Sequence, residues 1–529
     1  MCIVGAGAAG GIMALELARR GVSVGVLESG PRHDFARRPE RVRRLLRGED
    51  PWATAIPGLD AYTAGDKAPD PLERNRVRGV GGSSLHWEGY ALRMHADDFR
   101  MRTLHGVADD WPLGYGELEP YYAKAEAALG IAGAADDPWA SPRSSPFPLP
   151  AFPFSYTDGL FERASRTVGV RIHHLSQARN SIPYGGRAQC RACATCQVCP
   201  TGAKASVDLT HIPRAEATGL AHVLAGATAL RLALGAGGRV SHVVYAGPDR
   251  REHRMAARVF VLAAGAVENP RLLLLSATRD QPRGIGNGSG SLGRYFMSHP
   301  VIDVTGRLNR PSFPHRVGFS TAMSRQFAVG GARSRRGAFL LEFLNTAGPV
   351  PAAIAAASNE RGAALRAHVR AEYGRTVGVR IYGEPLPHRD SSVTLDLKAV
   401  DYFGNPAPHV TPIVHAYERD GLMEAQGVVI DILRAMGAGA IAPGPLHFSG
   451  HQIGTHRMGA DPASSVVNAD LRSHEIPNLY LVGSGSFVTA AASHPTLTIA
   501  ALAIRAAEHI ALGLRPAAPG SGAPERRGA

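Results

Sequence analysis

The N-terminal segment, residues 1–29, contains the feature that most constrains the fold. The apolar run MCIV is followed by GAGAAGG, by a helix-like stretch that ends at Gly21, and by a second apolar run that leads to an acid. Glycines spaced G-x-G-x-x-G let the backbone approach a pyrophosphate at a helix N-terminus, and an acid about 20 residues further on binds the ribose hydroxyls. Because the strand, the helix, the second strand and the acid all occur at the spacing of a dinucleotide-binding motif, the segment predicts a dinucleotide-binding unit rather than a merely structural glycine turn. The residues that carry this prediction are Gly5, Gly7, Gly10, Glu28 and Ser29.

Four of the five cysteines fall into one short run, QCRACATCQVCP, with two residues between successive cysteines. Structural zinc sites usually take two short-spaced pairs from separate loops. Closely spaced thiolates that end in Cys-Pro are instead typical of iron–sulfur proteins, although the last spacing here is two residues rather than three. The run therefore predicts an iron–sulfur cluster, with zinc and disulfides or free thiols as the alternatives. The expected ligands are Cys190, Cys193, Cys196 and Cys199.

The totals exclude some classes of protein. A chain of 529 residues is long enough for two or three domains. The net charge is +13, but only four of the 58 basic residues are lysine and no basic run alternates with aromatic residues, so we expect no nucleic-acid binding. We find no uninterrupted apolar run of about 18 residues and no signal peptide before the glycine motif, so we expect neither a transmembrane helix nor a cleaved leader.

Three further stretches carry a resemblance to a known family. They are VRGVGGSSLHWEGYALR at 77–93, ARVFVLAAGAVENPRLLLLS at 257–276, and the segment from 447 to 509. Together with the first glycine motif they resemble the glucose–methanol–choline (GMC) oxidoreductases, in the family's order and over nearly the whole chain. The resemblance implies that FAD is the dinucleotide. The additional residues it places against FAD are Arg78, Gly81, Gly82, Ser83, His86, Ala264, Gly265, Gly483, Ser484, Pro495 and Thr496.

The resemblance also implies a two-domain α/β architecture. We expect a Rossmann-like FAD-binding domain and an α+β substrate domain with a mostly antiparallel sheet. The FAD domain is expected at residues 1–110, 201–300 and 446–514, the substrate domain at 111–200 and 301–445, a cysteine-rich insertion at 179–204, and a disordered tail at 515–529. Patterns of apolar residues further predict a β-meander over 221–261 and helices over 352–372 and 418–437.

Within the family, the words RNSIPYGGRAQC and CPTGAK around the cysteine run are similar to those of bacterial iron–sulfur sugar dehydrogenases. The even C-x2-C spacing resembles the glucoside 3-dehydrogenase branch more than the glucose 1-dehydrogenases, and it leaves a three-iron or a four-iron cluster open. His86-Trp87 resembles the site at which pyranose oxidases attach FAD covalently. Related iron–sulfur sugar dehydrogenases keep this pair around non-covalent FAD, and we expect the non-covalent form here.

The C-terminal segment supplies the expected catalytic residues. His451 in GHQIGTHRMG and His494 in SHPT fall on the two catalytic positions of the family motif. A neutral histidine accepts the hydroxyl proton while hydride leaves carbon for the flavin, and a second group holds the oxygen. We expect His451 to be the base and His494 to position the alcohol, although the two roles are interchangeable on sequence grounds. His299 belongs to another family motif and is expected to be structural, like His447, His456 and His474.

These features predict an FAD-dependent dehydrogenase that oxidises a secondary hydroxyl of a sugar or glycoside, preferably at C3. Electrons would leave FAD through the iron–sulfur cluster to a cytochrome or quinone, and a small accessory subunit is expected. The alternatives are an oxygen-using pyranose or glycoside oxidase, a glucose 1-dehydrogenase, a hydroxynitrile lyase, and a zinc-containing binding protein. A signal-bearing partner would carry the chain to the periplasm; without one it would remain in the cytoplasm.

Overall fold

The computed structural model describes residues 1–54, 56–65, 75–313 and 318–514. Its first layer is a five-stranded parallel sheet with the strand order β20-β11-β1-β2-β7. Its strands are β1 (Cys2–Val4), β2 (Val24–Glu28), β7 (Ala221–Ala225), β11 (Phe260–Leu262) and β20 (Leu479–Leu481). β1 lies in the middle of this sheet, so the glycine motif that follows it opens at the sheet's carboxyl edge, as predicted.

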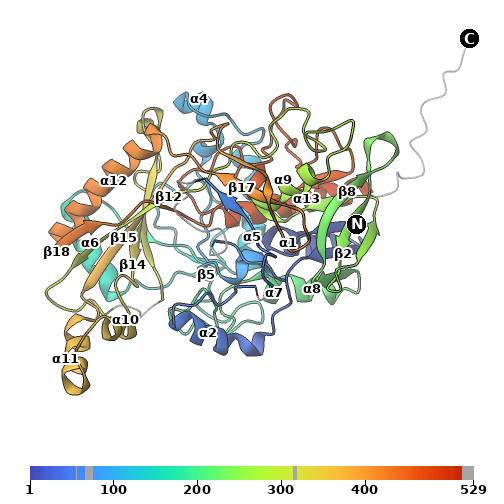
Figure 1. Ribbon diagram of the computed structural model, residues 1–529. Coiled ribbons are helices and arrows are strands. Elements are labelled where there is room, and N and C mark those ends of the chain that lie inside the picture. Colours follow the sequence, from blue (N-terminus) through green and yellow to red (C-terminus); the bar gives the residue numbers. More distant parts are fainter. Residues whose placement is uncertain (55, 66–74, 314–317, 515–529) are drawn as a thin grey trace, which may run out of the picture.

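A bundle of helices covers this sheet. α1 (Ala8–Ala18) packs against α13 (Thr496–Leu514), and α13 packs in turn on α5 (Tyr115–Leu129), as the right half of Figure 1 shows. α13 is long and apolar enough to cross a membrane by length and composition alone, but 67% of its most apolar stretch is buried inside the molecule. Its apolar character is therefore that of a largely buried core helix.

A three-stranded antiparallel sheet lies next to this bundle. It consists of β8 (Thr228–Leu234), β9 (Val240–Ala246) and β10 (Glu252–Ala256). The predicted meander was therefore wrong about its first and last members, because β7 and β11 at the two ends of that segment join the parallel sheet instead. α9 (Gly265–Leu275) follows β11 and packs on β8, which places its first turn at the edge where β1 ends.

The second large sheet is antiparallel and forms the left half of Figure 1. α12 (Ala416–Ala435) packs on it and also contacts α6 (Tyr156–Thr167). The strands of this antiparallel sheet follow the order β18-β12-β15-β14-β13-β6, with β19 paired to β12. They are β6 (His173–His174), β12 (Pro300–Arg307), β13 (Ala322–Ser324), β14 (Phe339–Leu344), β15 (Thr376–Gly383), β18 (Gly439–Pro443) and β19 (His447–Phe448).

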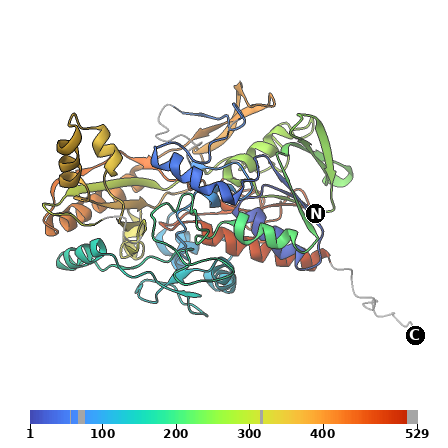
Figure 2. The ribbon, with the colours of Figure 1, turned by 90° about the horizontal axis from the view of Figure 1, so that it is seen from below.

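Two other elements differ from the sequence expectations. The alanine-rich stretch forms two helices, α10 (Pro351–Ala356) and α11 (Gly362–Glu372), which project at the lower left of Figure 1. The proline- and arginine-rich stretch 31–76, whose composition predicts an irregular segment, contains a helix, α2 (Arg38–Leu46), which lies on the face shown in Figure 2. A strand pair, β16 (Ser392–Val400) and β17 (Pro406–Thr411), packs on α9 and pairs with β3 (Thr63–Ala64).

The α/β fold class with a parallel sheet and a largely antiparallel second sheet is confirmed. The division into an FAD domain and a substrate domain at the stated boundaries stays a prediction. The expected disordered tail lies outside the described residues.

Candidate active site

A cavity of about 630 Å³ opens where the carboxyl edge of the parallel sheet faces the antiparallel sheet. Fourteen of the sixteen residues predicted to bind the cofactor line it: Gly5, Gly7, Glu28, Ser29, Arg78, Gly82, Ser83, His86, Ala264, Gly265, Gly483, Ser484, Pro495 and Thr496. The other two, Gly10 and Gly81, lie behind the lining. A Cβ on Gly10 would stand 1.9 Å from the Gly5 carbonyl oxygen, so this glycine serves close packing of α1 on its own loop.

Two glycine loops meet at the start of α1. Gly5 has φ +101°, and a Cβ there would lie 2.6 Å from the carbonyl oxygen of Ala263. Gly82 has φ +51°, and its Cβ would lie 2.7 Å from the Cα of Gly7. The N-terminus of α1 therefore faces the cavity with bare backbone, which is the arrangement that binds a pyrophosphate.

The carboxylate of Glu28 ties three backbone segments together at the cavity wall. Its Oε2 accepts a hydrogen bond from the Ala6 amide at 2.9 Å, and its Oε1 accepts from Gly30 at 2.9 Å and Gly79 at 3.1 Å. Burial raises the pKa of Glu28, and these amide donors oppose that effect. The predicted role of Glu28 in ribose binding is untested, but its anchoring of the glycine loops is visible.

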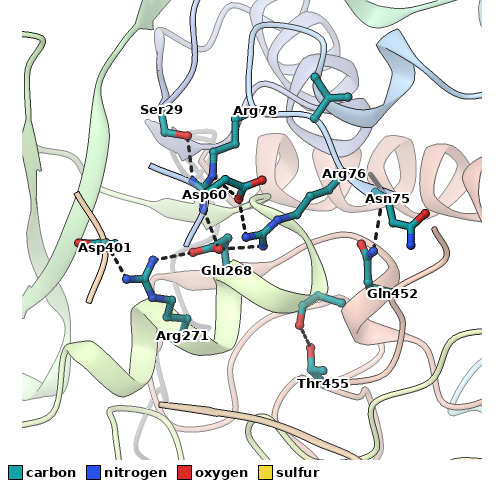
Figure 3. A network of polar contacts seen from close by, with 12 residues as sticks. Ser29, Asp60, Asn75, Arg76, Arg78, Glu268, Arg271, Asp401, Gln452 and Thr455 are labelled. Carbon is teal, nitrogen blue, oxygen red and sulfur yellow. Dashed lines mark hydrogen bonds and ion pairs between the residues drawn. The ribbon is translucent and has the colours of Figure 1, made fainter. Parts of the chain in front are cut away.

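A network of six charged side chains lies beside Ser29 (Figure 3), and five of them, all except Asp60, line the cavity. Arg76 and Arg78 each form ion pairs with both Asp60 and Glu268. Arg271 pairs with Glu268 and with Asp401. The three arginines hold the pKa of Glu268 well below its usual range despite burial. Sequence reasoning named Arg78 alone for binding. The partners Asp60, Arg76, Glu268, Arg271 and Asp401 come from four separate segments and carry no common motif.

The two predicted catalytic histidines meet at the other end of the cavity. The ring centroids of His451 and His494 are 5.2 Å apart, although the residues are 43 positions apart in the chain. Tyr382 on β15 packs against both imidazoles, with its ring centroid 6.0 Å from that of His451 and 4.7 Å from that of His494. Burial lowers the pKa of His451 well below its usual value, and His299 and His494 lower it further. Both imidazoles are therefore held neutral.

His299 orients the imidazole of His451 through a chain of hydrogen bonds. Its Nε2 faces the carbonyl oxygen of Ala491 at 3.1 Å and must donate to it. Its neutral Nδ1 is then an acceptor, and it lies 3.1 Å from Nδ1 of His451. His451 consequently carries its proton on Nδ1 and presents an unprotonated Nε2, the form that a general base needs. Sequence reasoning assigned His299 a structural role and missed this contact.

Both ring nitrogens of His494 are buried without a hydrogen-bond partner among the described residues. Burial lowers the pKa of His494 to about 3. Buried polar groups normally have partners. Because His494 lines the cavity, an oxygen of a bound molecule would satisfy one of these nitrogens, in agreement with a positioning role.

The cysteine run forms a loop with three non-glycine residues in the left-handed region: Ala192, Ala194 and Cys199. Cys196 and Cys199 are buried, Cys190 is half-buried and Cys193 is exposed, and all are free thiols. Across the described residues, no three His, Cys, Asp or Glu side chains form a group that could hold a metal ion. The predicted four-cysteine ligand set is therefore not shown.

Buried cations surround this loop. Arg179 donates to Sγ of Cys190 at 3.5 Å, and the Lys204 amide donates to Sγ of Cys199 at 3.2 Å. Arg38, on α2, donates to the carbonyl of Cys199 at 3.2 Å and pairs with Asp208. The exposed fractions of these three basic residues are 2% for Arg38, 1% for Arg179 and 0% for Lys204. These buried positive charges lie next to the sulfurs, so the loop is suited to carry negative charge.

Lys204 also connects the cysteine loop to the cavity. Its Nζ donates to the carbonyl oxygens of Leu85 at 2.9 Å and Trp87 at 2.6 Å, on either side of His86. Trp87 Nε1 donates to Ala205 at 2.7 Å. Burial, together with Lys204, lowers the pKa of His86 to about 4, so this cavity-lining imidazole is neutral.

The fold and the site define a class: an oxidoreductase with a dinucleotide-binding cradle at one end of its cavity and facing neutral imidazoles at the other. GMC oxidoreductase family models match residues 72–301 and 387–503. The chain is 32% identical to the fructose dehydrogenase large subunit of Gluconobacter japonicus, over 96% of this chain and 97% of that protein. It is 30% identical to 2-methyl-1,2-propanediol dehydrogenase of Mycolicibacterium austroafricanum, over 96% and 94%. The protein belongs to the GMC oxidoreductase family.

A solved structure supports the same fold. Pyridoxine 4-oxidase from Mesorbium loti superposes with a TM-score of 0.64 at 18% identity, covering 96% of this chain and 98% of that one. As a family member, the chain is an FAD-dependent oxidoreductase that acts on CH–OH groups of alcohol or sugar-type substrates. The bare-backbone cradle at α1 and the unpartnered nitrogens of His494 fit FAD and an alcohol in one continuous cavity.

Proposed function

We propose that this protein is a dehydrogenase for a secondary hydroxyl of a sugar or glycoside, with C3 as the preferred position. We further propose that the cysteine run holds an iron–sulfur cluster that serves an external electron acceptor. The observation that supports the proposal is that His451 and His494 face each other at one end of the cavity. Lys204 forms hydrogen bonds both to the cysteine loop and to the segment that lines the cavity at His86. The cofactor-binding assignments remain part of this proposal.

In the proposed reaction, FAD supplies the acceptor for the hydride that leaves the substrate carbon. Nε2 of His451 accepts the hydroxyl proton, since its Nδ1 already donates to His299. His494 holds the same oxygen and thereby aims the carbon. The low pKa of both rings keeps them neutral at physiological pH, so neither repels the incoming proton before the reaction begins.

The surroundings of the cysteines support a cluster rather than free thiols. Buried Arg38, Arg179 and Lys204 supply positive charge that an anionic cluster with thiolate ligands would balance. Backbone amides also point at two of the sulfurs, from Ala192 to Cys190 at 3.4 Å and from Lys204 to Cys199. A cluster bound here would supply one-electron transfer to the acceptor, for which a cytochrome or quinone is proposed.

Metal and oxygen chemistry distinguish the dehydrogenase from its rivals. The purified protein should contain iron and acid-labile sulfide, and oxidation of sugar in air should release little hydrogen peroxide. Absence of iron together with stoichiometric peroxide would instead identify an oxidase. Zinc without iron would identify the cysteine run as a structural metal site, which would remove the proposed route to an external acceptor.

A substrate panel tests the reaction itself. Anaerobic addition of sugars and glycosides should bleach the flavin absorbance, which a lyase would not do. Product analysis by NMR should show a ketone at C3; a lactone would indicate attack at C1. The relatives support a sugar substrate and an assembly, since one is named a fructose dehydrogenase large subunit and another a gluconate 2-dehydrogenase flavoprotein. A small accessory subunit is therefore part of the proposal.

The variant His451→Ala tests the base. Loss of a general base typically costs about a hundredfold or more in rate. The rate of flavin bleaching by substrate should fall accordingly while the protein keeps its FAD. His447→Ala provides a control, because this half-buried histidine lines the same cavity without contacting the imidazole pair. An unchanged bleaching rate in His451→Ala would refute the assignment.

A further inference from the structure

Beyond the paired imidazoles, the cavity has a polar wall that the reaction described above does not use. Tyr90, Arg380 and Tyr382 line the cavity there. The ring of Tyr90 stands 5.1 Å from that of His494, edge to face, and Tyr382 approaches the same imidazole from β15. A substrate carbon held at the imidazoles would therefore bring its neighbouring atoms against this wall.

The Tyr90 hydroxyl is one of the unsatisfied groups in this wall. The side chain is 4% exposed, and although Ser320 and Glu342 lie near its oxygen, no hydrogen bond of good geometry joins that oxygen to a residue that the structure describes. Buried hydroxyls are almost always hydrogen-bonded, because leaving one unpaired costs its desolvation energy. Since Tyr90 lines the cavity, a hydroxyl of a bound molecule would remove this cost.

A buried carboxylate lies behind Tyr90. Glu342 on β14 is 1% exposed and is opposite Arg380 of β15 in the sheet register. Its Oε1 accepts from Ser320 at 2.7 Å, whereas its Oε2 has no partner among the described residues. Burial raises the pKa of the Tyr90 hydroxyl well above its usual value, and the charge of Glu342 adds to this effect. The two groups are therefore close neighbours.

The charge of this wall is not positive, although it contains an arginine. Arg380 donates to both carboxylate oxygens of Asp303, at 2.7 Å and 2.9 Å, so its charge is already paired. Glu88 lines the cavity and makes no ion pair with any described residue. Glu88 is two residues before Tyr90 in the same cavity-lining segment, which places its carboxylate beside this wall. In agreement with this position, its charge adds to the effect of burial in raising the pKa of Glu342.

We propose that Tyr90 and Glu88, backed by Glu342, form a subsite that binds the non-reacting hydroxyls of a neutral polyhydroxylated ring. Tyr90 can donate to or accept from such hydroxyls, and Glu88 can accept from them. The same acids repel a carboxylate, so the subsite selects sugars and glycosides against sugar acids. This inference rests on the proposed function, because it specifies the substrate class of that site.

The first test uses Tyr90→Phe, which removes one oxygen and leaves the ring in place. The concentration of glucose or methyl glucoside that gives half-maximal anaerobic flavin bleaching should rise about tenfold, the effect of one lost hydrogen bond. The same quantity for cyclohexanol, which has no second hydroxyl, should change less than about twofold. Tyr121→Phe, on α5 away from the cavity, is the matched control.

The second test addresses charge. In Glu88→Gln, the ratio of half-maximal concentrations for gluconate and glucose should fall about tenfold, because one repulsive charge is gone. Glu342→Gln should move the ratio in the same direction and provides a second variant if one of the two fails to fold. Equal effects of Tyr90→Phe on sugar and cyclohexanol, or an unchanged gluconate ratio in both glutamine variants, would overturn the subsite.

The two levels of the proposal fail differently. If no sugar bleaches the flavin of the unaltered enzyme, the proposed function itself is wrong. If sugars bleach it and the variants at Tyr90, Glu88 and Glu342 behave like the unaltered enzyme, only the subsite is wrong.

Discussion

At the scale of single residues, the hydrogen bond between His299 and His451 is the most consequential contact of the site. Replacing His299 by Phe removes it and leaves the His451 proton free to move between its two nitrogens. We expect the flavin-bleaching rate to fall about tenfold to a hundredfold, with a smaller change in substrate affinity. The measurement is anaerobic stopped-flow absorbance over a range of substrate concentrations and pH.

His299→Gln provides the control for this prediction, because its amide can donate to the Ala491 carbonyl and accept from His451 as the imidazole does. The Gln variant should recover much of the rate. Equal losses in the Phe and Gln variants, with an unaltered pH profile, would show that His299 only fills space.

The pH dependence of the reaction follows from the burial of the imidazoles. Burial lowers the pKa of His451 well below 6.5 and that of His494 to about 3. A base with a lowered pKa is already deprotonated above that pKa. The limiting rate of flavin bleaching should therefore stay level from pH 8 down through pH 6.5, whereas a base with the ordinary imidazole pKa of about 6.5 would lose half its activity there. A rate that falls by half near pH 6.5 would contradict this.

Glu342 makes a separate prediction about stability. Burial raises its pKa to about 7, above its value of about 4.3 in an unfolded chain. The folded state therefore binds this proton more tightly, and the associated stability is complete below pH 4.3 and lost as pH rises through 7. Glu342→Gln does not titrate. The melting temperature of this variant relative to the unaltered protein should rise by about 2 °C or more between pH 5 and pH 8.

Glu424→Gln, the same substitution at a more exposed position, is the control for the stability measurement. A constant difference for Glu342→Gln would show that the carboxyl is ionised throughout.

At the scale of elements, the placement of α1 depends on two glycine loops that touch. A methyl group on Gly82 would meet the Cα of Gly7 at 2.7 Å, and φ at Gly82 is in the left-handed region. Gly82→Ala should therefore separate the loops and lower the FAD content of the purified protein by about tenfold, with the fold retained. Gly116→Ala on α5, where no atom lies within 4 Å, should leave the flavin content unchanged.

At the scale of the whole molecule, a buried ion cluster joins the two sheet systems. Arg333, 1% exposed, contacts Asp98 at 2.8 Å and also Glu384, which follows β15. Removing one partner of such a cluster leaves uncompensated buried charge, so Arg333→Met should cost about 3–5 kcal/mol of unfolding free energy. Arg336→Met, which breaks a pair with the exposed Glu424, should cost about 1 kcal/mol or less. Chemical denaturation checks both, and equal costs would contradict the argument.

Local pattern predicted much of the fold because the responsible residues are neighbours in sequence. The glycine motif, the following helix and Glu28 lie within one short segment, and the structure confirms strand, helix and strand there. The errors of the sequence-based prediction also concern short segments. The alanine-rich stretch between 351 and 372 has helical propensity throughout, but it breaks into two helices at 357–361. Helix α2 was missed because its arginines obscure any apolar pattern, although Arg38 is buried under the cysteine loop.

The sequence by itself determined the class of chemistry. A dinucleotide cradle, two histidines in matching motifs and a cysteine run are each written in consecutive residues, and local backbone geometry is set by near neighbours. Tertiary structure alone decided how these parts meet: that His299 orients His451, that Lys204 joins the cysteine loop to the cavity, and that Tyr90 faces His494. The physical reason is that such contacts arise from packing between elements distant in the chain, which no local pattern records.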